Sequence, residues 1–269
     1  MNWRYELDRW SFRAVFFLIA AVGMFFLIFP TIVVLITSLT ASEVLQFPPK
    51  EYSLRWYWEL KDAVQIRDAT VNSFLVATVT TIGAIVLGVT GALAIARSNA
   101  NWAKGADMVF MSPLLLPQLA YGFAALMMFS MVGARLSIWV LILGHIAVCV
   151  PFVLRTTIAA LAQLSNSLLE SSYSLGAGKF YTFRRVTYPL IKPGVMAGGF
   201  IAFMSSFDNV PVSLFLTDPQ IEVLPIHLWQ IINNELDARA ASTAGVLIII
   251  TVLLLIAMER AAGVTRYMR

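Results

Sequence analysis

Residues 165–180 read Ser-Asn-Ser-Leu-Leu-Glu-Ser-Ser-Tyr-Ser-Leu-Gly-Ala-Gly-Lys-Phe, the longest polar and basic interruption in the apolar second half of the chain. Ser167 and Glu170 have the spacing of a capping box, in which the serine caps a helix and the glutamate reaches back to the backbone N–H of the cap. Gly176 stands where a left-handed residue ends such a helix. The stretch therefore predicts a short capped helix followed by a sharp turn.

A second short helix is expected from about residue 179 to residue 188, because Pro189 and Pro193 lack the backbone N–H that continues a helix. The expected result is a helix–turn–helix over residues 165–189, called the elbow below. Its first limb carries small side chains, and its second limb is basic and aromatic. We expect such a shape to fit a groove on another protein; the alternative is that it packs against this chain's own ends.

The rest of the chain has the composition of a membrane protein. Of its 269 residues 59% are hydrophobic and 13% are charged, with a mean hydropathy of +0.79, whereas a soluble domain needs about a quarter of charged residues to cover its surface. The net charge of +4 is modest and favours a membrane over a nucleic-acid partner. The single cysteine, Cys149, excludes an internal disulfide.

Six apolar runs are long enough to cross a bilayer as helices, and they are too continuous for the alternating strands of a barrel. We expect one transmembrane domain over residues 1–269, with spans at about 14–37, 71–96, 107–133, 136–158, 192–216 and 241–260. The first run is longer than the apolar part of a signal peptide and is read as a retained span. Pro113 and Pro117 are expected to kink or break the third span, and Pro151 the fourth.

Lys and Arg are distributed unequally between the two sides that these spans define. The side with both termini and the elbow carries 13 of the 19, and the other side carries 6 among many acidic residues. Because positive residues concentrate on the cytoplasmic side, both termini and the elbow are predicted to be cytoplasmic and residues 38–70 external. In that outer loop Trp56, Tyr57 and Trp58 form either an interface anchor or a docking surface for an external protein.

The elbow resembles a known family motif. Its pattern is Glu170-Ser171-Ser172, three residues, Gly176, nine residues, then Val186-x-Tyr188-Pro189. This resembles the EAA loop of type I ABC-importer permeases, which reads Glu-Ala-Ala, three residues, Gly, nine residues and Ile-x-Leu-Pro. Two serines replace the alanines, and a tyrosine replaces the leucine.

The resemblance implies an all-α membrane protein with six transmembrane helices, whose elbow is a cytoplasmic coupling helix seated on a separate ATPase subunit. ATP and Mg would be bound by that subunit, and no cofactor by this chain. The residues assigned to ATPase docking on this basis are Glu170, Ser171, Ser172, Gly176, Ala177 and Pro189. The alternative for Glu170 is that it is only a helix cap.

Most of the chain is similar to the permeases of spermidine/putrescine importers, in particular to the second permease of such a system. The similarity rests on residues 206–216 with Leu224-Pro225-Ile226, on Gly144-His145-Ile146 with Pro151-Phe152-Val153, and on Tyr52-Ser53-Leu54-x-Trp56-Tyr57. It implies a complex in the bacterial inner membrane, in contact with lipid and not with nucleic acid. The implied partners are a second homologous permease in a heterodimer, an ATPase dimer and a periplasmic or extracellular substrate-binding protein.

Asp208 is the main candidate for a substrate pathway. A carboxylate within a span costs at least about 2.5 kcal/mol and is expected to face a cavity or a partner. Asn209, Ser205 and His145 complete the candidate set. The alternatives are a residue that pairs two helices, for Asp208, and a hydrogen-bonded core histidine, for His145. Polyamine-type relatives often have a second Asp where Asn209 stands, so a mono-cationic or zwitterionic amine, an opine or an organophosphonate stays open as substrate.

The expected function is to form half of the translocation pathway for a small polar, amine-bearing solute by ATP-driven alternating access. No catalytic residues are expected: neither histidine has a partner at metal-ligand spacing, no nucleophile–base pair is evident, and the loop Gly-x-x-x-x-Gly-Lys-Ser/Thr is absent. The chain is therefore expected to be a non-catalytic subunit. The alternative is an ion-coupled secondary transporter without an ATPase, although such proteins commonly carry internal repeats and no convincing repeat is seen.

Overall fold

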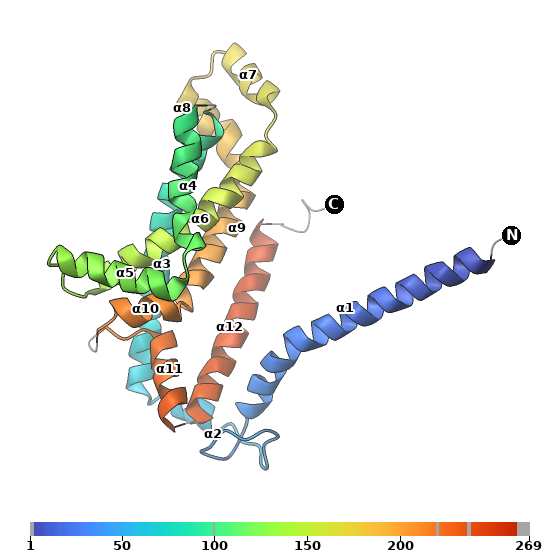
Figure 1. Ribbon diagram of the computed structural model, residues 1–269, viewed down its shortest axis with the longest axis vertical. Coiled ribbons are helices and arrows are strands. Elements are labelled where there is room, and N and C mark those ends of the chain that lie inside the picture. Colours follow the sequence, from blue (N-terminus) through green and yellow to red (C-terminus); the bar gives the residue numbers. More distant parts are fainter. Residues whose placement is uncertain (1–2, 99, 219–220, 236–237, 263–269) are drawn as a thin grey trace. The chain divides into compact units, whose positions relative to one another are not determined.

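The structure, a computed structural model, describes residues 3–98, 100–218, 221–235 and 238–262. This part of the chain is helical apart from its loops and one isolated bridge between Thr40 and Tyr52 (Figure 1), which confirms the all-α prediction for it. Arg266 and Arg269, counted among the cytoplasmic charges, lie outside the described residues. The helices are α1 (Trp3–Thr37), α2 (Arg55–Glu59), α3 (Val64–Ala96), α4 (Asn101–Leu115), α5 (Gln118–Met131), α6 (Ile138–Ala162), α7 (Asn166–Ser174), α8 (Lys179–Thr182), a π-helical turn (Phe183–Thr187), α9 (Tyr188–Phe207), α10 (Val210–Leu216), α11 (Leu224–Glu235) and α12 (Ala238–Ala262).

Five helical segments of the described chain are long and apolar enough to cross a membrane: Phe12–Thr37, Val64–Ala96, Ile138–Ala162, Lys179–Phe207 and Ala238–Ile256. The third predicted span, 107–133, is not one straight helix, because α4 and α5 meet at an angle of 107°. The break falls at Pro117, which precedes α5 and has no N–H to continue the ladder of α4. Pro113 stays within α4 and Pro151 within an unbroken α6. A count of six requires α4 and α5 to form one bent span.

The fifth predicted span, 192–216, differs at both ends. Pro189 and Pro193 do not end the elbow's second helix, because helical structure continues through them from residue 179 to residue 207. The π-helical turn directly before α9 accounts for Pro189, since its wider hydrogen-bond ladder lets a helix pass a residue that lacks an N–H, whereas Pro193 lies within α9 itself. At the other end α9 stops at Phe207, and α10 is a separate helix of 7 residues.

The chain divides into two compact units, residues 1–63 with 231–253 and residues 64–230 with 254–269. The prediction of a single permease domain stays a prediction. The second unit is built on α3, α6 and α9, which pack on one another. A Cβ added to Gly88 of α3 would lie 2.8 Å from Val153 Cβ of α6, and one added to Gly198 of α9 would lie 2.8 Å from Val153 Cα. Small residues thus permit the close approach that is typical of membrane helices.

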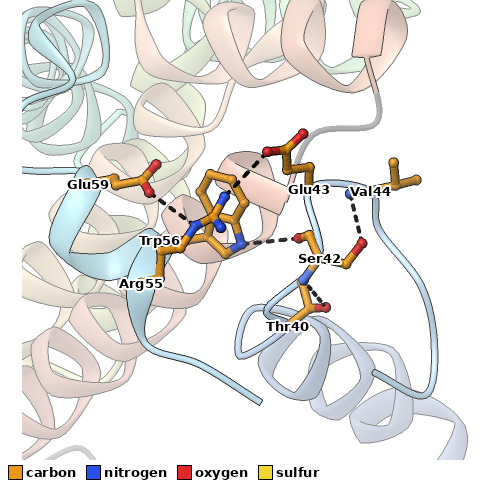
Figure 2. A network of polar contacts seen from close by, with 7 residues as sticks. All are labelled: Thr40, Ser42, Glu43, Val44, Arg55, Trp56 and Glu59. Atoms are coloured by element: carbon orange, nitrogen blue, oxygen red, sulfur yellow. Dashed lines mark hydrogen bonds and ion pairs between the residues drawn. The ribbon is translucent and has the colours of Figure 1, made fainter. Parts of the chain in front are cut away.

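The first unit contains the loop between α1 and residue 63, which is closed by polar contacts (Figure 2). Trp56 is buried, and its indole N–H donates to the carbonyl of Ser42 at 3.2 Å. Arg55 forms ion pairs with two glutamates of the same unit. Trp58, by contrast, is 63% exposed. The aromatic cluster is therefore divided: Trp56 holds the loop together, and Trp58 is available to a membrane interface or a partner.

The close approach of α6 and α9 can be tested with a matched pair of glycines. Gly198→Ala forces its methyl group against the backbone of α6 and is expected to lower the free energy of unfolding by about 1–3 kcal/mol. Gly105→Ala in α4, where nothing lies within 4 Å of an added Cβ, is expected to raise it by up to about 1 kcal/mol. Thermal unfolding of the detergent-solubilised protein measures both, and a Gly198→Ala variant as stable as the wild type would contradict the packing.

Candidate functional site

The first limb of the elbow is α7, and its cap differs from the prediction. Ser165 is the N-cap, since its hydroxyl accepts a hydrogen bond from the backbone N–H of Ser167 at 3.3 Å. The capping box predicted from Ser167 and Glu170 is therefore wrong. The physical reason is the backbone: Ser165 has the extended conformation of a cap, φ −66° and ψ 131°, whereas Ser167 is already helical.

The turn that ends α7 has the predicted conformation. Gly176 has φ +81°, in the left-handed region that a side chain disfavours. Its N–H donates to the carbonyl of Tyr173 at 2.9 Å, and the N–H of Ala177 donates to the carbonyl of Ser172 at 3.1 Å. These two bonds together are a Schellman motif, so the turn has a defined geometry.

The two limbs of the elbow are joined through buried hydroxyls. Ser172 Oγ and Thr182 Oγ1 lie 2.9 Å apart and are both buried. Ser172, assigned to docking from the sequence, therefore lies inside the elbow. Of the other assigned residues, Ala177 is half-buried, whereas Glu170, Ser171, Gly176 and Pro189 are exposed.

The exposed surface of the elbow also contains apolar residues outside the predicted docking set. Leu175 is 88% exposed and Phe180 is 77% exposed, and Tyr181 lies beside them in the chain at 59%. Large apolar side chains in an otherwise polar connection were the available signal. Exposed apolar groups rimmed by polar residues are typical of protein–protein contacts.

A cavity of about 500 Å³ lies behind the elbow. Its lining comes from the end of α6, the start of α7 and the first half of α9: Thr156, Ala159, Ala160, Gln163, Leu164, Ser165, Leu168, Leu190, Pro193, Gly194 and Ala197. α7 packs on α8 and on the π-helical turn. The elbow thus has a space behind it, between α7 and the membrane helices.

The junction between α9 and α10 contains Asp208 and Asn209. Asp208 ends α9 with φ −104° and ψ 14°, and its side chain is exposed. Asn209 is buried and caps α10, since its Oδ1 accepts from the N–H of Val212 at 2.9 Å. Pro211 stands in the first turn of α10, where no N–H donor is needed. Asn209 thus has a structural role here. Its spacing from Pro211, Asn-x-Pro, is the sequence pattern that could have predicted the start of a new helix.

His145 of α6 lies beside this junction and is 2% exposed. Its Nδ1 is 2.8 Å from Ser206 Oγ in α9, and its Nε2 is 3.1 Å from Ser213 Oγ in α10. This is the hydrogen-bonded core histidine that was the alternative to a pathway residue. Ser205 is half-buried. No sequence pattern pointed to Ser206 and Ser213, because their contacts with His145 join residues that are far apart in the chain.

The elbow and the junction lie at opposite ends of the same helices. Figure 1 shows α7 near one end of α6 and α10 near the other. α9 joins the elbow to Asp208 through 20 residues, or roughly 30 Å at about 1.5 Å per residue, which is close to the thickness of a bilayer core. Within the described residues no three His, Cys, Asp or Glu side chains stand together to hold a metal ion.

Solved structures with a similar arrangement of helices include chains of ABC transporters. A chain of a bacterial ABC transporter that imports the acidic polysaccharide alginate matches 97% of this chain and 98% of its own length, with a TM-score of 0.75 and 15% sequence identity. The MetNI methionine ABC transporter gives a TM-score of 0.61 at 16% identity, over 79% of this chain and 98% of the other. The fold is therefore that of an ABC-importer permease.

Curated relatives agree with the fold. The spermidine/putrescine transport system permease protein PotC of Escherichia coli is 26% identical over 234 residues, which are 87% of this chain and 88% of PotC. The putrescine permease protein PotI of Escherichia coli is 26% identical over 241 residues, covering 84% of each chain. A putative 2-aminoethylphosphonate permease protein, PhnV of Salmonella typhimurium, is 26% identical over 197 residues, or 72% of this chain and 74% of PhnV.

The family itself follows from a match to residues 84–262, which fit the binding-protein-dependent transport system inner membrane component family. The chain belongs to this family and is the permease component of an ABC importer. This membership disfavours the alternative of an ion-coupled secondary transporter.

The conformation of the elbow can be tested with its two glycines, both of which have open space around them. Gly176→Ala places a side chain at positive φ, at a cost of about 1–2 kcal/mol, and is expected to speed amide hydrogen exchange at residues 175–177 by about 5- to 30-fold. Gly178→Ala, at φ −71°, is expected to leave these rates unchanged. Equal rates in the two variants would show that the turn does not depend on the left-handed residue.

Proposed function

We propose that this chain forms half of the translocation pathway of an importer for small amine-bearing solutes, driven by ATP hydrolysis in separate subunits. The observation that carries the proposal is the placement of an exposed elbow and an exposed carboxylate, Asp208, at opposite ends of α6 and α9. The first is suited to an ATPase on one side of a membrane. The second is suited to a cationic solute that arrives from the other side.

The elbow is proposed to dock on the ATPase subunit through Glu170, Ser171 and the exposed apolar side chains of Leu175 and Phe180. Its Schellman turn and the buried Ser172–Thr182 contact keep its shape, while the cavity behind α7 gives it room to move relative to the membrane helices. ATP and Mg are bound by the ATPase pair, and this chain contributes no catalytic group. Closure of that pair on ATP would move the elbow and open the pathway outward.

The topology proposed for this function has six spans in a bacterial inner membrane, with α4 and α5 as one bent span and both termini in the cytoplasm. The excess of Lys and Arg on the side of the elbow supports this orientation. The partners proposed are a second homologous permease, an ATPase dimer and an external substrate-binding protein. Membership of a binding-protein-dependent family supports this set, and the similarity to PotC and PotI supports a heterodimer.

A polyamine-like substrate is supported by the names of PotC and PotI and by Asp208. Asn209 is used as a helix cap, so this chain offers one carboxylate at the junction and not two. The name of PhnV refers to 2-aminoethylphosphonate, which also carries an amine. An ammonium group is thus the chemistry that these solutes share, and a carboxylate is its natural partner.

Docking of the elbow predicts that Glu170→Lys lowers the stimulation of ATPase activity by loaded binding protein by at least about tenfold, as expected when a charged contact is reversed at an interface. Lys104→Glu, which reverses an exposed charge outside the elbow but on the same predicted side, should leave stimulation within about twofold, since it removes no elbow contact. ATPase assays on the purified complex, with subunit ratios checked on gels, measure both. Full stimulation of the Glu170→Lys complex would refute the docking role.

A role for Asp208 in the pathway predicts that Asp208→Asn raises the KM for putrescine uptake by about tenfold or more, because a hydrogen bond to an ionised group is lost. Asp62→Asn, at an exposed position of the outer loop, serves as the control and should keep the wild-type KM. Uptake of radiolabelled putrescine into proteoliposomes that hold the whole transporter measures the two constants. An unchanged KM in the Asp208→Asn variant would remove Asp208 from the pathway.

A further inference from the structure

His145 holds both sides of the α9–α10 junction at once. One ring nitrogen contacts Ser206 in the last turn of α9, at 2.8 Å, and the other contacts Ser213 in α10, at 3.1 Å. Asp208 and Asn209 lie between these two serines in the chain. A single side chain of α6 therefore contacts both helices, one on each side of the junction.

The chemistry of the three groups is matched. A neutral imidazole offers one donor and one acceptor, and a serine hydroxyl can serve as either, so both contacts can be satisfied together. His145, Ser206 and Ser213 are 2%, 3% and 0% exposed. Water cannot replace a lost partner at such a site, so each bond contributes more than it would at the surface.

α10 depends on such contacts because 7 residues are too few to form a stable helix alone. A Cβ added to Gly122 of α5 would lie 2.9 Å from the carbonyl oxygen of Pro211, so α5 and the start of α10 approach closely. Tyr121, next to that glycine, donates its hydroxyl to the carbonyl of Gly144 at 3.0 Å. α10 thus packs on both α5 and α6, and His145 provides a polar contact from α6.

We infer that His145 is a positioning residue for Asp208: by bonding Ser206 and Ser213 it holds the junction so that the carboxylate stays exposed. His145 itself is enclosed and does not contact the solute. The positional part of this inference concerns this chain alone. Its consequence for substrate affinity rests on the proposed function.

The test places Asp208→Cys in the chain assembled with its partner subunits, and measures the rate at which a membrane-impermeant maleimide labels the permease band. Cys149, the chain's own cysteine, is 1% exposed and out of reach. Ser206→Ala and Ser213→Ala each keep His145 but remove one of its bonds. Each is expected to slow labelling at position 208, because losing about one buried hydrogen bond lowers the equilibrium constant between the held and the displaced junction by about threefold to tenfold.

Glu51→Cys, at an exposed position of the outer loop, is the control and should label at the same rate with or without the serine substitutions. An unchanged rate at position 208 would overturn the inference. Equal changes at positions 208 and 51 would overturn it as well, because they would mean that the substitutions loosen the whole chain. His145→Leu, where it assembles, should reproduce the effect of the serine variants.

Uptake separates positioning from general stability. Ser213→Ala and Asp208→Asn are compared singly and together for the KM of putrescine. If His145 acts through Asp208, the double variant is no worse than Asp208→Asn alone, whereas multiplied effects contradict that route. If the wild-type complex takes up neither putrescine nor spermidine, the proposed substrate fails, and the labelling rates still decide the role of His145.

Discussion

A backbone N–H or C=O left without a partner in hydrocarbon costs several kcal/mol, and the α9–α10 junction is where this chain meets that constraint. The break is bonded on both sides: the N–H of Asp208 reaches Met204, and the side chain of Asn209 accepts from Val212. Pro211 has no backbone N–H to satisfy. Asn209, and not Asp208, provides the side-chain cap of α10.

α6 connects this junction to the elbow as one unbroken helix of 25 residues. His145 stands near its start and holds α10, whereas its last turns line the cavity behind α7. Gly194 and Gly198 allow α9 to lie close to the same helix. The elbow therefore adjoins α6 and α9, the same two helices that are joined near Asp208 by the contact between His145 and Ser206.

Local features were predictable from the sequence, and long-range ones were not. The conformation of Gly176 follows from a few neighbouring residues. The missing N–H of Pro117 is consistent with the break there, but the same feature at Pro113 and Pro151 breaks neither α4 nor α6. The cap of α7 was misassigned because Ser165 and Ser167 have the same chemistry and only the backbone distinguishes them. The hydropathy pattern predicts one fifth span that continues past Asp208, because hydropathy does not distinguish an asparagine that caps a new helix from one inside a helix. The partners of His145 lie 61 and 68 residues away, and no periodicity encodes them.

The π-helical turn between α8 and α9 sets the rotational phase of everything that follows it. A π turn holds one residue more than an α-helical turn, and one residue corresponds to about 100° of rotation about the axis, since an α-helix has about 3.6 residues per turn. Without that extra residue, the glycine face of α9 would point about a quarter turn away from α6. The elbow and the membrane helix are thus joined by a spacer whose length in residues decides which face of α9 meets the bundle.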